Sequence, residues 1–189
     1  MRIIAGVAKG RTLGTVAGAT RPTSDRAREG LFSSLTSQFG DFLGLNVLDL
    51  FAGSGAIGLE ALSRGASIVH VIERDPDAQK TIEHNYEAVK KNQPVGAFHL
   101  YAMPAQRFLS DAPKERYHIV YIDPPFEYTD REVEELLGKL HSGEFLKSDA
   151  LIAVERTAKG STFSWPVGFL AARERKYGAA TIYYGSCAP

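Results

Sequence analysis

Apolar residues come in short runs along the chain, and most of these runs end at glycine, proline or charged residues. Runs of this length and composition predict buried strands rather than long helices. The chain contains five of them, at residues 46–52, 67–73, 97–102, 118–123 and 150–155.

Between these runs, apolar residues recur at helical spacing. Residues 56–65 close on a glycine, which is a common helix end, and the sequence "RPTSD" at residues 21–25 resembles a helix start. Pro76 opens a third helical segment, and a fourth follows Pro125. Outside residues 56–65, the apolar stripes are Ala27, Leu31, Leu35 and Phe39; Ala78, Ile82, Tyr86 and Val89; and Val133, Leu136, Leu137 and Leu140.

Strands that alternate with helices predict an α/β protein with a mostly parallel sheet covered on both faces. After Arg173 the helical pattern stops, and "RERKYGAATIYYG" predicts two closing strands around Gly178. These strands would form an antiparallel hairpin at the edge of the sheet. Residues 1–20 predict a short hairpin or an extended arm.

Composition fits one globular domain. The chain has 189 residues, of which 44% are apolar and 23% are charged. No apolar run approaches the ~20 residues needed to cross a membrane, and the N-terminus is too polar for a secretory signal. The single cysteine, Cys187, suits a reducing cytoplasm. The five histidines lie far apart, so we expect no metal site.

Charge is distributed unevenly. Residues 1–30 hold six basic and two acidic side chains, whereas the rest holds sixteen basic and twenty acidic ones. This pattern fits a polyanion bound at one edge of the protein, and equally a solvated extension. The six basic residues are Arg2, Lys9, Arg11, Arg21, Arg26 and Arg28.

A GxGxxG motif spans Gly53 to Gly58, between a predicted strand and a predicted helix. Glycines at this place let a ligand approach the backbone closely. Glu73 follows twenty positions after Gly53 and could accept hydrogen bonds from a ribose diol. The pair predicts an adenosine-containing cofactor, either a nicotinamide dinucleotide or S-adenosylmethionine. The alternative is that the glycines only pack a helix against a strand.

Asp49 lies inside an apolar run, where an unpaired carboxylate is costly. It could brace the glycine loop or meet a positively charged part of the cofactor. S-adenosylmethionine carries a sulfonium and an ammonium, whereas a dinucleotide brings a pyrophosphate that a carboxylate repels. Asp49 therefore favours S-adenosylmethionine.

The sequence "YIDPPF", residues 121–126, ends a predicted strand in a rigid corner. The side chain of Asp123 and the carbonyl of Pro124 could each accept one N–H of an exocyclic base amine. The amine lone pair would then point at a methyl donor, while Pro125 stiffens the corner and Phe126 stacks on the base. The alternative is a turn in which Asp123 caps a helix.

Four motifs together resemble the RsmD family of bacterial 16S rRNA guanine-N2 methyltransferases. They are "RPTSDRAREGLF", "LDLFAGSGAIGLEALSRGA", "VIERD" and "YIDPPF". The resemblance implies a Rossmann-like, seven-stranded class I methyltransferase fold. It also implies S-adenosylmethionine as methyl donor, S-adenosylhomocysteine as product, and a guanine of 16S rRNA as acceptor, in a small-subunit assembly intermediate with ribosomal proteins.

The resemblance also suggests site residues. Where the family usually has an acidic residue that holds the adenine, this chain has Pro104, so Met103 or the backbone at Ala105 would replace it. The other expected cofactor residues are Asp49, Phe51, Gly53, Ser54, Gly55, Glu73 and Arg74. The catalytic residues would be Asp123, Pro124, Pro125 and Phe126, and the RNA contacts Arg2, Lys9, Arg11, Arg21, Thr23 and Arg26.

We expect residues 1–40 to form a basic, RNA-binding hairpin and helix, and residues 41–189 to form the methyltransferase domain. Two other classes of function stay open. One is an amino-methyltransferase that acts on DNA adenine or on a protein glutamine amide. The other is a nicotinamide oxidoreductase or an RNA-binding module without catalysis.

Overall fold

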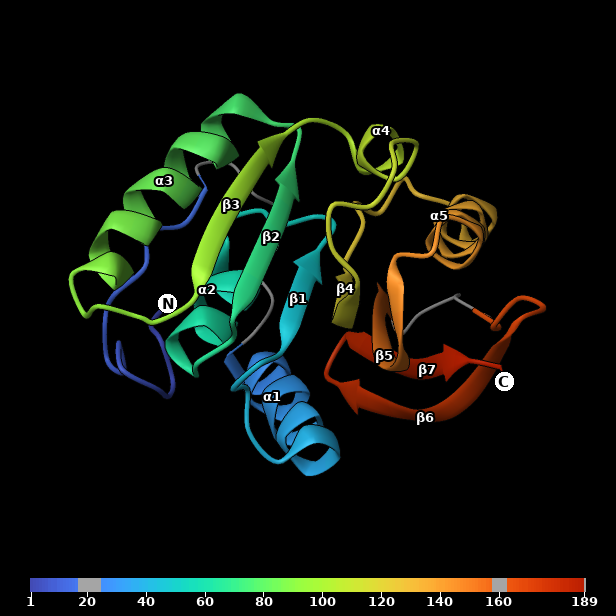
Figure 1. Ribbon diagram of the computed structural model, residues 1–189, viewed down its shortest axis with the longest axis horizontal. Coiled ribbons are helices and arrows are strands. Elements are labelled where there is room, and N and C mark those ends of the chain that lie inside the picture. Colours follow the sequence, from blue (N-terminus) through green and yellow to red (C-terminus); the bar gives the residue numbers. More distant parts are fainter. Residues whose placement is uncertain (17–24, 158–162, 189) are drawn as a thin grey trace.

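The computed structural model describes residues 1–16, 25–157 and 163–188. Its centre is a seven-stranded sheet in the order β3-β2-β1-β4-β5-β7-β6 (Figure 1). Strands β1 to β5 are parallel to one another, and β6 and β7 run antiparallel at one edge. The strands are β1 (Asn46–Asp49), β2 (Ile68–Glu73), β3 (Ala97–Ala102), β4 (Tyr117–Ile122), β5 (Leu146–Thr157), β6 (Phe169–Tyr177) and β7 (Ala180–Cys187).

Helices cover both faces of this sheet, as the sequence predicts. One apolar cluster joins one face to α1 (Asp25–Phe39), α2 (Ala56–Ser63) and α3 (Pro76–Lys90). A second cluster joins the other face to α4 (Ala105–Phe108) and α5 (Asp130–Ser142). The predicted stripes point inward, and the four apolar residues of the α5 stripe are fully buried. The predicted α/β class and the antiparallel C-terminal hairpin are confirmed.

Several boundaries differ from the prediction. The first strand ends at Asp49 rather than at residue 52, because the backbone after it turns into the glycine loop. Strand β5 is longer than the apolar run that predicts it, since its ends carry polar residues. Helix α4 was not predicted, because it is a single turn and periodicity cannot detect it.

Residues 1–16, the N-terminal segment, fold back on themselves as an irregular hairpin. Only Arg2 and Thr12 form an antiparallel bridge, and backbone hydrogen bonds join Ile3 to Arg11 and Leu13 to Met1. The expected hairpin is therefore present in a short form. The "RPTSD" helix start lies mostly outside the described residues.

The N-terminal segment packs on α2 rather than extending into solvent. The buried carboxylate of Glu60 accepts the backbone N–H groups of Ile4 at 2.7 Å and of Ala5 at 3.0 Å. Three apolar residues of the segment are buried in the same cluster as α2: Ile3, Ala8 and Leu13. The segment is thus part of the main hydrophobic core, and its assignment to a separate RNA-binding extension stays a prediction.

Arg28 does not belong to the basic surface. Its side chain is fully buried in α1, and its guanidinium donates to the backbone carbonyl of Arg2 and to Asp25. The expectation that it adds to a surface charge is therefore wrong, because a helical spacing places it on the inward face of α1 beside Ala27 and Leu31.

Candidate active site

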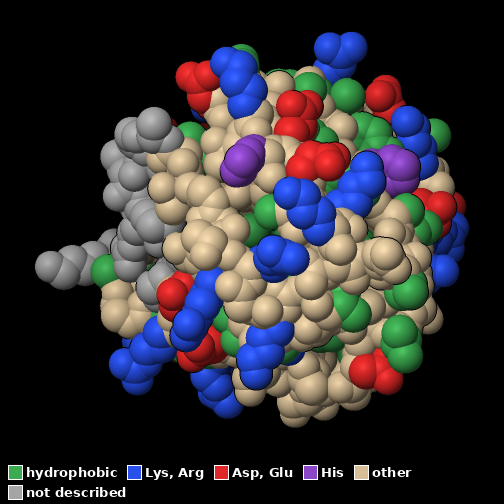
Figure 2. Space-filling view, turned by 90° about the vertical axis from the view of Figure 1, so that its left-hand side faces the viewer, with side chains coloured by type: hydrophobic (Ala, Val, Ile, Leu, Met, Phe, Trp, Pro, Cys, Tyr) green, Lys and Arg blue, Asp and Glu red, His purple; other side chains and the backbone are tan. Residues whose placement is uncertain are grey.

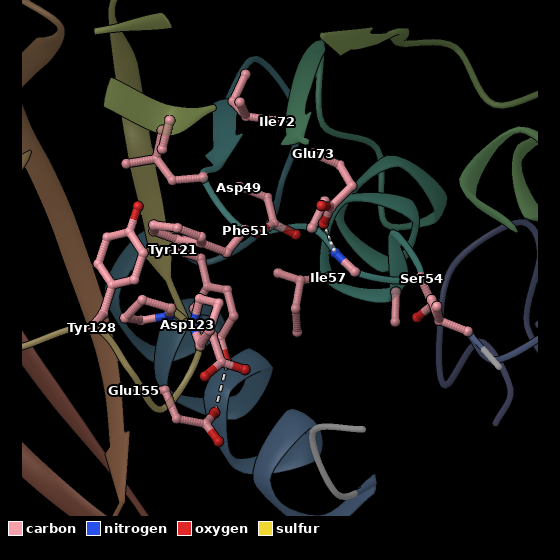
Figure 3. Close-up of a pocket in the computed structure, with 18 of the residues that line it drawn as sticks. Asp49, Phe51, Ser54, Ile57, Ile72, Glu73, Tyr121, Asp123, Tyr128 and Glu155 are labelled. Atoms are coloured by element: carbon pink, nitrogen blue, oxygen red, sulfur yellow. Dashed lines mark hydrogen bonds between the residues drawn. The ribbon is translucent and has the colours of Figure 1, made fainter. Parts of the chain in front are cut away.

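A cavity of about 500 Å³ opens at the carboxyl ends of the parallel strands. Open α/β sheets bind ligands at this edge, because the loops that follow neighbouring strands converge there. The last residues of β1, β2 and β5 line the cavity together with the segments that follow β1, β2 and β4, and Figure 3 shows their side chains facing one another across it. The N-terminal segment closes one part of the wall with Met1, Thr15 and Val16.

The glycine loop forms one side of the cavity. Gly53 lines it with a φ of 55°, and a Cβ built there would meet no atom within 4 Å. Gly55 does not line the cavity. It is the N-cap residue of α2, with a φ of 77°, and a Cβ built on it would point toward the side chain of Ile82. A Cβ at Gly58 would lie 2.5 Å from Val71, so this glycine serves the packing of α2 on β2. Only part of the motif therefore faces the cavity.

Glu73 is held in place by the backbone. One of its carboxylate oxygens accepts the N–H of Gly53 at 2.8 Å, as Figure 3 shows, and the other accepts the N–H of Asp75 at 2.8 Å. Asp75 in turn caps the start of α3, where Pro76 follows. Each oxygen of an ionised carboxylate can accept further hydrogen bonds. Glu73 can therefore bind a diol while it fixes the glycine loop.

Asp49 is almost fully buried at the end of β1 and lines the same cavity. Neither of its carboxylate oxygens makes a hydrogen bond of ordinary geometry with the described residues. Burial raises its pKa to about 7, while the backbone N–H of Phe51 lowers the pKa and Glu73 raises it. A positively charged ligand in the cavity would stabilise the ionised form of this buried carboxylate.

The "DPPF" corner forms the opposite wall. Strand β4 ends at Ile122, and the side chains of Asp123 and Pro124 line the cavity from there. The carbonyl of Pro125 accepts the N–H of Tyr128 at 3.0 Å and so closes the turn. Phe126 also lines the cavity, with 59% of its surface exposed. An exposed aromatic ring at a rigid corner offers a stacking face for a planar ligand.

The start of α4 supplies the region where the sequence predicts adenine contacts. Met103, Pro104 and Ala105 line the cavity. Pro104 is the N-cap of α4 and gives its first turn no side-chain hydrogen bond. The backbone N–H of Ala105 makes no hydrogen bond within the described residues, so it is available to a ligand. The cavity thus brings together all the predicted cofactor residues except Gly55.

Sequence reasoning missed several residues of the wall. The hydroxyl of Tyr121 donates to Glu155 at 2.6 Å, and both residues are buried beside the "DPPF" corner. Arg156 pairs with Asp130 at 2.9 Å and donates to the carbonyl of Tyr128. One signal in the sequence points to these residues. The apolar run "ALIAVER" ends in the charged residues Glu155 and Arg156, and charged residues are rarely buried in a strand unless they are paired.

The four predicted RNA-binding residues that the structure describes lie outside the cavity. Arg2, Lys9, Arg11 and Arg26 are exposed, whereas Arg21 and Thr23 lie outside the described residues. Arg11 donates to the side chain of Asn92 at 2.8 Å. This contact places the N-terminal segment next to the end of α3, on a face where several Lys and Arg side chains are visible (Figure 2). Two further exposed basic residues precede Asn92 there, Lys90 and Lys91.

Within residues 1–16, 25–157 and 163–188, no group of His, Cys, Asp and Glu side chains is arranged to hold a metal ion. Among the helices of the same residues, none is both long and apolar enough to cross a membrane.

Solved structures with the same architecture define the class of this fold. The Escherichia coli protein yhhF superposes with a TM-score of 0.83 at 32% identity, covering 100% of this chain and 99% of that one. Magnesium protoporphyrin IX methyltransferase from Synechocystis PCC 6803, solved with bound S-adenosylmethionine, gives 0.65 at 15% identity over 86% and 79% of the two chains. The second likeness concerns the fold alone. The chain has the fold of a class I methyltransferase.

Sequence comparison narrows the class to a family. A family model described as conserved hypothetical protein 95 matches residues 1–186. The ribosomal RNA small subunit methyltransferase D of Escherichia coli K12 is 35% identical over 179 residues, which cover 94% of this chain and 85% of that protein. This chain belongs to the family of conserved hypothetical protein 95, and its predicted place in the RsmD family is confirmed.

Proposed function

We propose that the protein transfers a methyl group from S-adenosylmethionine to the exocyclic N2 of a guanine in 16S rRNA. The observation that carries the proposal is the shared cavity. The glycine loop and Glu73 form one side of it, and the "DPPF" corner forms the other. A cofactor and a base amine could therefore meet inside it. The relative in Escherichia coli is named as a methyltransferase of small-subunit rRNA, which supports this acceptor.

The cavity wall fits S-adenosylmethionine. The buried carboxylate of Asp49 makes no hydrogen bond of ordinary geometry with the described residues and so suits a cationic ligand, and the open space over Gly53 admits one close to the backbone. Glu73 would accept the ribose hydroxyls. The N–H of Ala105 would donate to the adenine, beside Met103. The bound cofactor supplies a methyl group made electrophilic by its positively charged sulfur.

The "DPPF" corner would orient the acceptor. Asp123 and the carbonyl of Pro124 each accept one N–H of the amine, so its lone pair faces the glycine loop. The carboxylate of Asp123 would also offset the positive charge that grows on N2 as the N–C bond forms and the S–C bond of the cofactor breaks. S-adenosylhomocysteine and one of the two amine protons would then leave. Phe126 stacks on the base and holds it in the cavity. Alignment and electrostatics therefore supply most of the rate enhancement.

The exposed basic residues of the N-terminal segment and of α1 would hold the RNA backbone. Phosphate contacts position a nucleic acid without reading its sequence. So small a chain has little surface for reading RNA by itself. We therefore propose a partly assembled small subunit as the substrate, with ribosomal proteins that complete the recognition surface.

The test is transfer of labelled methyl groups from S-adenosylmethionine to three acceptors: naked 16S rRNA, immature small subunits and mature small subunits. We expect label in RNA, recovered as N2-methylguanosine after digestion to nucleosides, and the highest rate with immature subunits. Label recovered as N6-methyladenine in DNA, or as methylglutamine in protein, would refute the proposed acceptor.

A further inference from the structure

Glu155 lies beside the catalytic corner, although no motif in the sequence marks it. Strands β4 and β5 are parallel neighbours, and Ile122 pairs with Val154 in their register. Asp123, the first residue after β4, therefore lies opposite Glu155, the next residue of β5, and both line the cavity. Figure 3 shows the two carboxylates at the same end of it.

The Glu155 side chain is held in one orientation. Only 8% of its surface is exposed, and one carboxylate oxygen accepts the Tyr121 hydroxyl at 2.6 Å. An ionised carboxylate has about four acceptor positions, so the bond from Tyr121 occupies a fraction of its capacity. Glu155 can therefore present a fixed acceptor to a base in the cavity.

The acceptors at this corner match the donors of one base. Guanine presents N1–H and the two N2–H groups side by side on its Watson–Crick edge. Adenine presents two N6–H groups beside N1, which is an acceptor. Asp123 and the Pro124 carbonyl account for the two amine hydrogens. A third acceptor next to them suits the N1–H of guanine and repels N1 of adenine.

We infer that Glu155 selects guanine by accepting a hydrogen bond from N1–H. The inference rests on the proposed function, because it concerns the same base in the same cavity. The contact has a second effect on the reaction. A carboxylate on N1–H pushes electron density into the ring, which makes the N2 lone pair more nucleophilic. Glu155 therefore acts as a specificity residue that touches the substrate, next to the alignment residues of the corner.

The experiment compares guanine with 2-aminopurine, which keeps the exocyclic amine but has an acceptor at N1 in place of N1–H. The methylated position is mapped first, and rRNA with either base at that position is then ligated and assembled into immature subunits. For the parent protein we expect kcat/KM to fall roughly 10- to 100-fold with 2-aminopurine, since a buried acceptor loses its donor. In Glu155→Gln the amide N–H can donate to N1 of 2-aminopurine, so we expect the guanine preference to shrink at least several-fold.

The preference is a ratio measured on one variant, so a partly unfolded preparation does not change it. Glu174→Gln, which makes the same substitution at an exposed position of β6, should keep the parent ratio. An unchanged ratio in Glu155→Gln, with guanine still methylated by the parent, would overturn the role of Glu155 alone. Transfer by the parent to adenine N6 would overturn both this role and the proposed function.

Discussion

The surroundings of Asp49 disfavour an ionised carboxylate. Burial raises its pKa from 3.8 to about 7. The folded protein therefore holds a proton that the unfolded chain releases between these values, and the stability contributed by this group falls as pH rises from about 4 to about 7. A cationic ligand in the cavity would reverse the preference and favour the ionised form.

Replacing Asp49 by asparagine removes this titration. We predict that Asp49→Asn stabilises the cofactor-free protein relative to the parent above pH 7, by up to about 4 kcal/mol, and that the gain disappears near pH 4. Affinity for S-adenosylmethionine should fall in the same variant. Urea unfolding at several pH values measures the first effect and calorimetric titration the second. A stability difference independent of pH would show that Asp49 does not titrate in this window.

Glu73 should account for much of the cofactor affinity. In Glu73→Gln the charge is lost while the side chain keeps its size, so we predict roughly 10- to 100-fold weaker binding of S-adenosylmethionine. Isothermal titration of the folded variant measures it. Glu83→Gln, an exposed position of α3, is the control and should bind as the parent does. Equal affinity of the Glu73 variant and the parent would remove this residue from the cofactor site.

Asp123 should separate binding from chemistry. We predict that Asp123→Ala binds S-adenosylmethionine within a few-fold of the parent but transfers methyl groups about 100-fold more slowly or worse, because one group that orients the amine is gone. Single-turnover transfer to immature subunits measures the rate. Glu134→Ala on the exposed face of α5 should keep the parent rate. A rate close to the parent's in the Asp123 variant contradicts the alignment mechanism.

At the scale of elements, the contact between the N-terminal segment and α2 supports one part of the cavity wall. Gly6 has a φ of 83°, and a Cβ built there would lie 1.8 Å from the backbone oxygen of Ser63. Gly10 has a similar φ of 85°, but a Cβ there would meet no atom within 4 Å. The two glycines therefore differ in packing while they share the same backbone conformation.

This pair gives a controlled test of the docking contact. We predict that Gly10→Ala costs about 1–2 kcal/mol of unfolding free energy, from the left-handed conformation alone. Gly6→Ala should cost clearly more, because the backbones must also separate, and it should weaken cofactor binding through Met1 and Thr15. Thermal unfolding and titration measure the two effects. Equal losses in both variants would mean that the close approach to α2 contributes little.

At the scale of the whole molecule, the exposed basic residues near Asn92 extend the charged surface beyond the N-terminal segment. Arg11 contacts Asn92, which follows Lys90 and Lys91 directly. These three basic residues come from distant parts of the sequence, and the fold brings them to one face. If this face holds rRNA, each phosphate contact adds to the salt dependence of binding.

We predict that the combined variant Arg11→Gln, Lys90→Gln and Lys91→Gln binds immature subunits more weakly, with a shallower dependence of affinity on salt. The slope should decrease by about 1 for each phosphate contact that is lost. Affinity for S-adenosylmethionine should stay unchanged. Arg131→Gln, an exposed basic position on α5, serves as the control. Parallel salt curves of equal height for parent and triple variant would place the rRNA on another face.

The sequence predicted the fold well because the signals for strands, helices and turns lie within short stretches of the chain. Apolar runs and helical stripes mark the parallel strands and four of the five helices in the described part of the chain, and glycine and proline mark their ends. The site residues that belong to motifs could be predicted for the same reason. Glu73, Asp123 and most of the glycine loop lie at or just after the end of a strand that the sequence predicts. Helix α4 escaped because one turn has no periodicity.

Contacts between distant segments were decided only by the tertiary structure. The sequence does not reveal that Glu60 holds the N-terminal segment, that Arg28 is buried, or that Glu155 lies next to Asp123. Each depends on which side of an element a polar residue faces and on what packs against it. A charged residue reads the same in a sequence whether it is solvated or buried against a partner, and the difference arises when the sheet and its helices assemble.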